Sequence, residues 1–191
     1  MAPYIDTDAV ALAALVRGHV NNCVAVLGGA AEPPMLTFRG RPLIEAYVWA
    51  RGGAELEAPA LAALAAVGAT PTAEALFLAF VTHASTASLA NLLACAANAN
   101  AANVLRDAAP RVVCHLILTG DAEGLRRFFE IGGVLPPAAA MPGGRLLHLA
   151  LDATPRDAAV ERLLIVRGRA DQNERDAEWG RTPSERARGA R

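Results

Sequence analysis

The chain has 191 residues, of which 53% are apolar and only 5% aromatic, and its formal net charge is −1. A charge so close to zero provides no overall field that would attract nucleic acid or an anionic membrane, so neither is expected as a partner. The abundance of small helix formers favours closely stacked short helices over a β-sandwich. We therefore expect one mostly helical domain over residues 1–191.

All 18 basic residues are arginine. A GC-rich genome, bacterial or viral, explains this composition, and evasion of ubiquitin ligation is the alternative. Asp6 and Asp8 stand where a secretory signal peptide would be apolar. The separate cysteines Cys23, Cys95 and Cys114 favour reduced thiols. These features together predict a cytoplasmic protein, in the cytoplasm or nucleus of a host if it is viral or an injected effector.

The first predicted unit, residues 5–39, holds two short helices and an extended stretch. Apolar residues recur at helical spacing from Val10 to Leu27, with a break near Gly18. Pro33 and Pro34 disfavour helix and predict an extended loop over residues 32–39.

Residues 40–71 and 72–109 are predicted to form two helix-turn-helix units. Leu43 and Leu76 are 33 residues apart in the first helices. Leu61 and Leu64 lie on the second helix of the earlier unit, which we expect to end at Gly68-Ala69. The connection that follows the later unit is several residues longer, so we expect a long loop over residues 103–110.

Residues 110–142 and 143–179 are predicted to repeat the same pattern, since His115 and His148 are also 33 residues apart. On the second helix of the earlier unit, at least one of Phe128 and Phe129 should be buried with Leu125. Arg126 and Arg127 should both lie on the solvated side.

In the later unit the second helix carries apolar residues from Val160 to Ile165, and Gly168 should end it in the left-handed conformation. Thr182-Pro183-Ser184-Glu185 is a capping box with proline at the first helical position. It predicts a terminal helix of at most two turns within residues 180–191, acting as a cap or as a basic docking tail.

The stretch from Gly143 to Ala187 resembles an ankyrin repeat. Its segments GGRLLHLA, VERLLIVRGRADQN and GRTPSERA follow the order of that family's Gly-x-Thr-Pro-Leu-His-x-Ala opening, second helix and Gly-Ala-Asp-x-Asn turn. The resemblance implies an all-α ankyrin-repeat solenoid of about five stacked helix-turn-helix units with short finger loops. Another helical solenoid is the alternative.

Motifs of common enzymes are missing from the sequence: it has no phosphate-binding loop, no His-Glu-x-x-His and no nucleophile elbow. We expect no enzyme, no cofactor and no metal ion. Cys114-His115 is the only adjacent thiol and imidazole, and it keeps a cysteine-dependent enzyme as an alternative. The resemblance implies that His115 and His148 instead bond backbone groups of neighbouring turns.

The run from Ala75 to Leu105 carries no charge but is rich in Ser, Thr and Asn. These polar groups are too many for a membrane span. The run is expected to form the centre of the stacked core, with an interface as the alternative.

The resemblance implies that a partner protein contacts the finger loops and the exposed side of the first helices. In residues 40–109 the candidate contact residues, chosen at or near the exposed ends of those helices, are Tyr47, Val48, Trp49, Arg51, Phe80 and His83. Trp, Tyr and Arg dominate interface energies. The expected function is non-enzymatic binding of another protein, such as a component of host machinery, and no small-molecule substrate is expected. A stoichiometric inhibitor of one enzyme is the alternative.

Overall fold

The chain is mostly helical in a computed structural model, which confirms the all-α class. The structure describes residues 7–17, 37–38, 41–66, 68–96, 100–137, 140, 145–154, 156–175 and 180–189. By its internal contacts the chain divides into two compact units, Met1–Leu105 and Arg106–Arg191. In the described part, no helix is both long enough and apolar enough to cross a bilayer.

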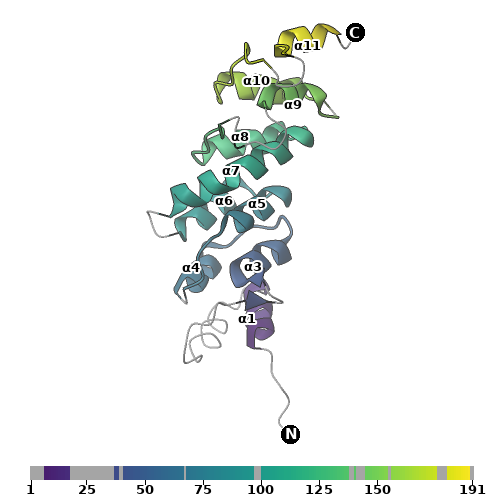
Figure 1. The fold of residues 1–191 in the computed structure, drawn as a ribbon. Helices are drawn as coiled ribbons and strands as arrows, with labels where there is room; N and C mark the ends of the chain where they lie inside the picture. Colours follow the sequence, from purple (N-terminus) through teal and green to yellow (C-terminus); the bar gives the residue numbers. More distant parts are fainter. Residues whose placement is uncertain are drawn as a thin grey trace. The chain divides into compact units, whose positions relative to one another are not determined.

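The first unit contains α1 (Thr7–Val16), β1 (Thr37–Phe38), β2 (Arg41–Pro42), α3 (Leu43–Arg51), α4 (Ala58–Ala66), α5 (Ala73–Val81) and α6 (Thr86–Ala94) (Figure 1). The two strands pair antiparallel, with Thr37 opposite Pro42. The expected extended stretch is thus confirmed at Thr37–Phe38, and α1 confirms the first N-terminal helix. The second helix expected before residue 32 falls outside the described residues.

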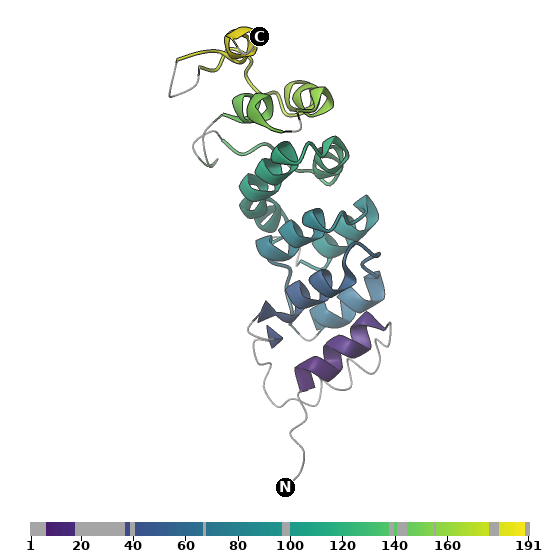
Figure 2. The ribbon, with the colours of Figure 1, turned by 90° about the vertical axis from the view of Figure 1, so that its right-hand side faces the viewer.

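Helices of the first unit pack in two rows. One row is formed by α1, α3 and α5, and α4 packs against α6 in the other (Figure 2). Leu43 and Tyr47 of α3 and their counterparts 33 residues on, Leu76 and Phe80 of α5, are all almost completely buried. The predicted 33-residue register therefore holds between these two helices.

The ends of these helices follow from local chemistry. The hydroxyl groups of Thr72 and Ser85 accept hydrogen bonds from backbone N–H groups in the first turns of α5 and α6, which satisfies donors that a helix start leaves open. After α4, Gly68 adopts φ +85° and the N–H of Ala69 donates to Leu64 O at 3.0 Å. The predicted end of this helix at Gly68-Ala69 is confirmed.

Hydrogen bonds to backbone atoms tie neighbouring helix pairs together. The N–H of Leu56, in the loop before α4, donates to Ser88 Oγ at 2.9 Å, and Asn91 Nδ2 donates to Leu56 O at 3.2 Å. The Thr72 hydroxyl donates to the buried carboxylate of Glu45 at 2.6 Å. Within Ala75–Leu105, Ser88 and Asn91 therefore serve internal packing, which favours the core interpretation of that run.

The second unit contains α8 (Ala122–Glu130), α9 (Leu146–Asp152), α10 (Ala158–Val166) and α11 (Pro183–Gly189). Before them, α7 (Ala101–Leu118) spans the boundary between the units. Within the second unit α10 packs against both α8 and α9, and α9 packs against α11. Figure 2 shows α11, in yellow, over the green pair formed by α9 and α10.

The long loop expected over residues 103–110 is wrong, because α7 continues through Pro110 to Leu118. Proline lacks the N–H of a regular helical bond and usually breaks a helix. Ala108 and Ala109 before the proline and Val112 and Val113 after it are all buried. Apolar burial on both sides of Pro110 favours a continuous helix and offsets the lost bond.

The expected cap at Gly168 is also corrected. Among the residues described, the positive φ after α10 belongs to Arg169, at 55°. A Cβ atom on Gly168 would collide with the side chain of Leu135, in the loop after α8. Gly168 is thus needed for the close approach of two loops and not for a left-handed conformation.

The C-terminal capping box is confirmed. The N–H of Thr182 donates to Glu185 Oε2 at 2.8 Å, and the N–H of Glu185 donates to Thr182 Oγ1 at 3.3 Å. The seven residues of α11 agree with the expected two turns. This helix is fastened to α9 by Arg186, whose guanidinium lies 2.7 Å from Asp152 Oδ2.

Candidate interaction surface

Trp49 lies at the C-terminal end of α3 with 66% of its surface exposed. Its backbone is fixed, because the carbonyl oxygen accepts a hydrogen bond from the capping N–H of Gly52 at 3.2 Å. Gly52 closes the helix in the left-handed conformation, with φ +50°. A large aromatic ring is therefore presented to solvent from an ordered backbone.

His83 lies in the turn after α5, and it is exposed. Its N–H donates to Phe80 O at 2.9 Å, and its φ of 59° is left-handed. Few residues other than glycine adopt this conformation without strain. The neighbouring turn approaches closely, because a Cβ atom on Gly53 would collide with Thr82 O. Trp49 and His83 thus border two turns that touch each other, and we call this pair the Trp49–His83 surface.

Three of the six candidate contact residues are not available to a partner. Tyr47, Val48 and Phe80 are almost completely buried, which corrects the expectation that they lie at exposed helix ends. The reason is that α3 is covered by α1, α5, α4 and the hairpin, so every residue from Leu43 to Val48 is buried. This burial raises the pKa of the Tyr47 phenol, while the neighbouring Glu57 backbone lowers it to a smaller extent.

Arg51 is committed to contacts inside the chain. Its guanidinium donates to Glu55 O at 2.8 Å and to Val16 O at 3.2 Å, and it pairs with Glu57 Oε1 at 3.2 Å. Only 17% of its side chain is exposed. Arg51 therefore holds the end of α1 and the loop before α4 to α3, and the exposed residues of the predicted patch are Trp49 and His83.

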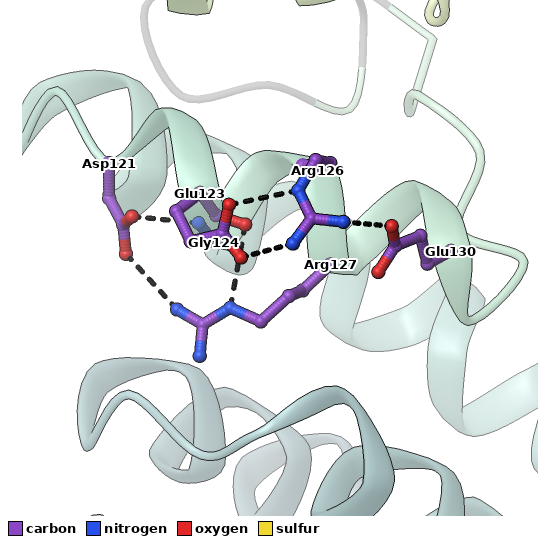
Figure 3. Close-up of polar contacts among 6 residues, drawn as sticks. All are labelled: Asp121, Glu123, Gly124, Arg126, Arg127 and Glu130. Atoms are coloured by element: carbon purple, nitrogen blue, oxygen red, sulfur yellow. Dashed lines mark hydrogen bonds and ion pairs between the residues drawn. The ribbon is translucent and has the colours of Figure 1, made fainter.

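The charged residues of α8 form a network within that helix and the turn before it (Figure 3). Arg126 lies between Glu123 and Glu130 and forms ion pairs with both. Asp121 accepts a hydrogen bond from the N–H of Gly124 at 2.7 Å, which caps the helix. The hydrogen bond from Arg126 lowers the pKa of the Glu123 carboxyl.

Arg127 belongs to the same network but is 8% exposed, so its expected place on the solvated side is wrong. Its guanidinium lies 3.7 Å from Asp121 Oδ2, and Nε donates to Glu123 O at 3.4 Å. Arg126 is exposed as expected, as Phe128 is buried and Phe129 half-buried. The long apolar stem of arginine lets the same residue cover the core and reach a surface carboxylate.

His148 confirms the role that the resemblance implied for it. The imidazole is buried, and its Nε2 is 2.8 Å from Arg181 O, 33 residues along the chain. With Nε2 as the donor, this bond joins α9 to the start of α11. His115 is half-buried on α7, and its expected backbone bond stays a prediction.

Cysteine chemistry has little support in the geometry. Cys95 and Cys114 are free and half-buried, and burial raises the pKa of both thiols. A nucleophilic cysteine needs the opposite shift, because the thiolate is the reactive form. Cys23 lies outside the described residues. In the described part of the chain no three His, Cys, Asp or Glu side chains gather in a way that could hold a metal ion.

Sequence reasoning missed two exposed apolar residues of the second unit, Val134 and Val166. Both follow directly on helical patterns that look buried, so no letter in the sequence distinguishes them. Comparisons with protein-family models, with curated proteins and with solved structures returned no match for the chain. The case for a function therefore rests on the pattern and surface of the chain itself.

Proposed function

We propose that the chain is an ankyrin-like repeat protein that acts in the cytoplasm by binding another protein. The exposed Trp49, held on an ordered helix end, is the observation that carries the proposal. A large aromatic side chain gains much free energy when a partner covers it, and it loses little conformational entropy because it has few rotatable bonds.

The 33-residue register supports the ankyrin-like part of the proposal. It appears in the matched burial of Leu43 with Leu76 and of Tyr47 with Phe80, and again in the hydrogen bond from His148 to Arg181 O. The short hairpin before α3 also agrees with a finger loop. In such an architecture each helix pair buries its apolar face on the next, and the helix ends are left for recognition.

The Trp49–His83 surface would work by occupancy. The partner's own surface would cover the indole of Trp49 and reach the imidazole of His83, with no bond made or broken. The turns beneath them are closely packed at Gly53 and Thr82, so the surface needs little reorganisation to bind. Preorganisation of this kind lowers the entropic cost of association.

The test is affinity capture from a host lysate with wild type and with Trp49→Ala and His83→Gly variants. Neither substitution should unfold the chain, because Trp49 is exposed and glycine accepts the backbone conformation of His83. A protein that wild type captures and both variants lose would support the proposal. The matched control is Val166→Ala, which removes another exposed apolar side chain from the second unit.

Capture that both variants retain unchanged would contradict the Trp49–His83 surface as the binding site. Arg51 is left intact in this design, because its substitution would release α1 and the loop before α4 and would confuse lost binding with lost structure.

A further inference from the structure

A groove in the second unit lies outside the Trp49–His83 surface. Its volume is about 260 Å³, and α9, α10 and α11 all contribute to it. The apolar part is formed by Leu147, Leu151, Ile165, Pro183 and Ala187. Pockets that hold small organic ligands are usually larger, roughly 300–1,000 Å³, so the groove suits a few side chains of a macromolecule.

The packing of the second helices indicates which kind of structure would cover this groove. In the first unit α4 packs on α6, and in the second unit α8 packs on α10. Each of these four helices has nine residues. One side of α10 is occupied by α8, and on the groove side none of the helices described lies against α10 beyond its partner α9. The element that repeatedly covers such a face in this chain is a short α-helix.

One position on the second helices shows that this face differs from the internal ones. The fourth residue after the N-cap is Leu89 on α6 and Leu125 on α8, and both are fully buried. On α10 the same position is Glu161, which pairs with Arg156 at 2.5 Å at the edge of the groove. A covering helix must therefore leave this pair in water and place its apolar side chains over Leu151 and Ile165.

The charge beside the groove indicates the flank of the covering helix. Residues 181–191 contain four arginines and one carboxylate, Glu185. Arg188 is exposed and lies one helical turn beyond Ser184, which lines the groove. An acidic side chain on the covering helix would meet this basic edge.

We propose that the groove between α9, α10 and α11 binds an amphipathic α-helix of a partner protein, whose apolar stripe enters the groove and whose acidic flank faces Arg188. The site is independent of the Trp49–His83 surface, so either can fail without the other. The side chains that enter would stand at i and i+4 of the bound helix, because this spacing places two side chains on one face.

The probe is a synthetic helical peptide of about 14 residues with leucines at i, i+3, i+4 and i+7 and glutamates on one flank, a spacing that forms an apolar stripe. Calorimetry measures its binding to the full chain at peptide concentrations up to about 1 mM, the range of weak binding. Ala187→Trp fills the groove and should weaken binding at least about tenfold, equivalent to about 1.4 kcal/mol. Arg188→Glu should weaken it several-fold and leaves the groove itself open.

Arg162→Glu is the matched control, because Arg162 is exposed on α10 and does not line the groove. It should bind the peptide as wild type does. Circular dichroism checks that each variant keeps its helices, and Arg188→Glu stays informative if Ala187→Trp disturbs α11.

Three results would overturn the proposal. One is no binding of the peptide by wild type, and another is equal binding by wild type, Ala187→Trp and Arg188→Glu. The third is self-association of the chain in sedimentation experiments that Ala187→Trp abolishes, which would assign the groove to a second copy of the chain. Equal affinity for a peptide with glutamines in place of glutamates would remove the acidic flank from the proposal.

Discussion

Neighbouring helix pairs in residues 1–105 are joined largely through backbone atoms, whereas residues 106–191 rely more on charged side chains. In the first unit Ser88 and Asn91 hold both polar groups of the Leu56 backbone, and Arg51 reaches Val16 O. In the second unit Arg186 pairs with Asp152, and Arg145 lies 3.5 Å from Glu174.

The difference teaches that one repeating architecture can be fastened in two ways that respond differently to solution conditions. Half-buried bonds to backbone atoms are little screened by salt, whereas exposed ion pairs are weakened by it. We expect the second unit to be the more sensitive to salt and pH.

The largest effects should come from core truncation, which should affect both units alike. Phe80→Ala and Phe128→Ala each remove a fully buried ring and should each cost about 3–5 kcal/mol of stability. Amide hydrogen exchange would report the loss of protection, in α5 and α6 for the first variant and in α8 and α10 for the second. A loss below 1 kcal/mol in either variant would contradict the burial on which this comparison depends.

Arginine substitutions should then separate the two units. Arg51→Met keeps the apolar stem but removes donors to Val16 O and Glu55 O, and it should cost about 1–2 kcal/mol. Arg126→Met should change stability little, because its ion pairs with Glu123 and Glu130 are exposed. Urea unfolding at low and high salt measures both. Equal losses would break the distinction between the two kinds of fastening.

Backbone strain offers a smaller and more even comparison. In the described part of the chain, His83 and Arg169 are the non-glycine residues with positive φ, at 59° and 55°, one in each unit. Glycine relieves the strain but adds freedom to the unfolded chain, so each glycine variant should gain roughly 0–1 kcal/mol. Thermal unfolding checks this gain, and a loss in only one unit would indicate that its side chain, not its backbone, matters.

The smallest effect is expected from acid. The pKa of Glu185 is lowered mainly by the hydrogen bond from the Thr182 backbone, and then by the Thr182 hydroxyl and the nearby arginines Arg175 and Arg188. A carboxyl with a lowered folded-state pKa stabilises above its usual value of 4.5, and this contribution is lost as the pH falls through the lowered pKa. Acidification below pH 4.5 should therefore loosen α11 before α5, as NMR amide signals would show. Glu185→Gln should remove most of this pH dependence.

The sequence supported much of the fold because its signals were local or periodic. The 33-residue spacing of Leu43 and Leu76, the glycine after α4 and the capping box at Thr182 each have a short-range physical cause, and all three agree with the structure. The ankyrin identity itself stays a prediction, since neither the fold class nor these local features distinguish that family from another helical repeat.

The errors arose where packing from several sides decided the outcome. Pro110 is a helix breaker in isolation, yet burial on both sides of it extends α7. Tyr47 and Trp49 are only two residues apart at the end of α3, and their opposite exposures depend on how many elements surround the helix. A sequence reveals the phase of one helix but not the number of its neighbours.

The exposure of Trp49 makes the chain its own optical reporter. An indole in water fluoresces at longer wavelengths than one covered by protein, so a partner that covers Trp49 would shift the emission to the blue. Trp179, the chain's other tryptophan, lies outside the described residues and could be replaced by phenylalanine to leave a single emitter. Because the chain has no lysine side chain for amine-reactive dyes, this intrinsic signal is the simplest label for following binding in solution.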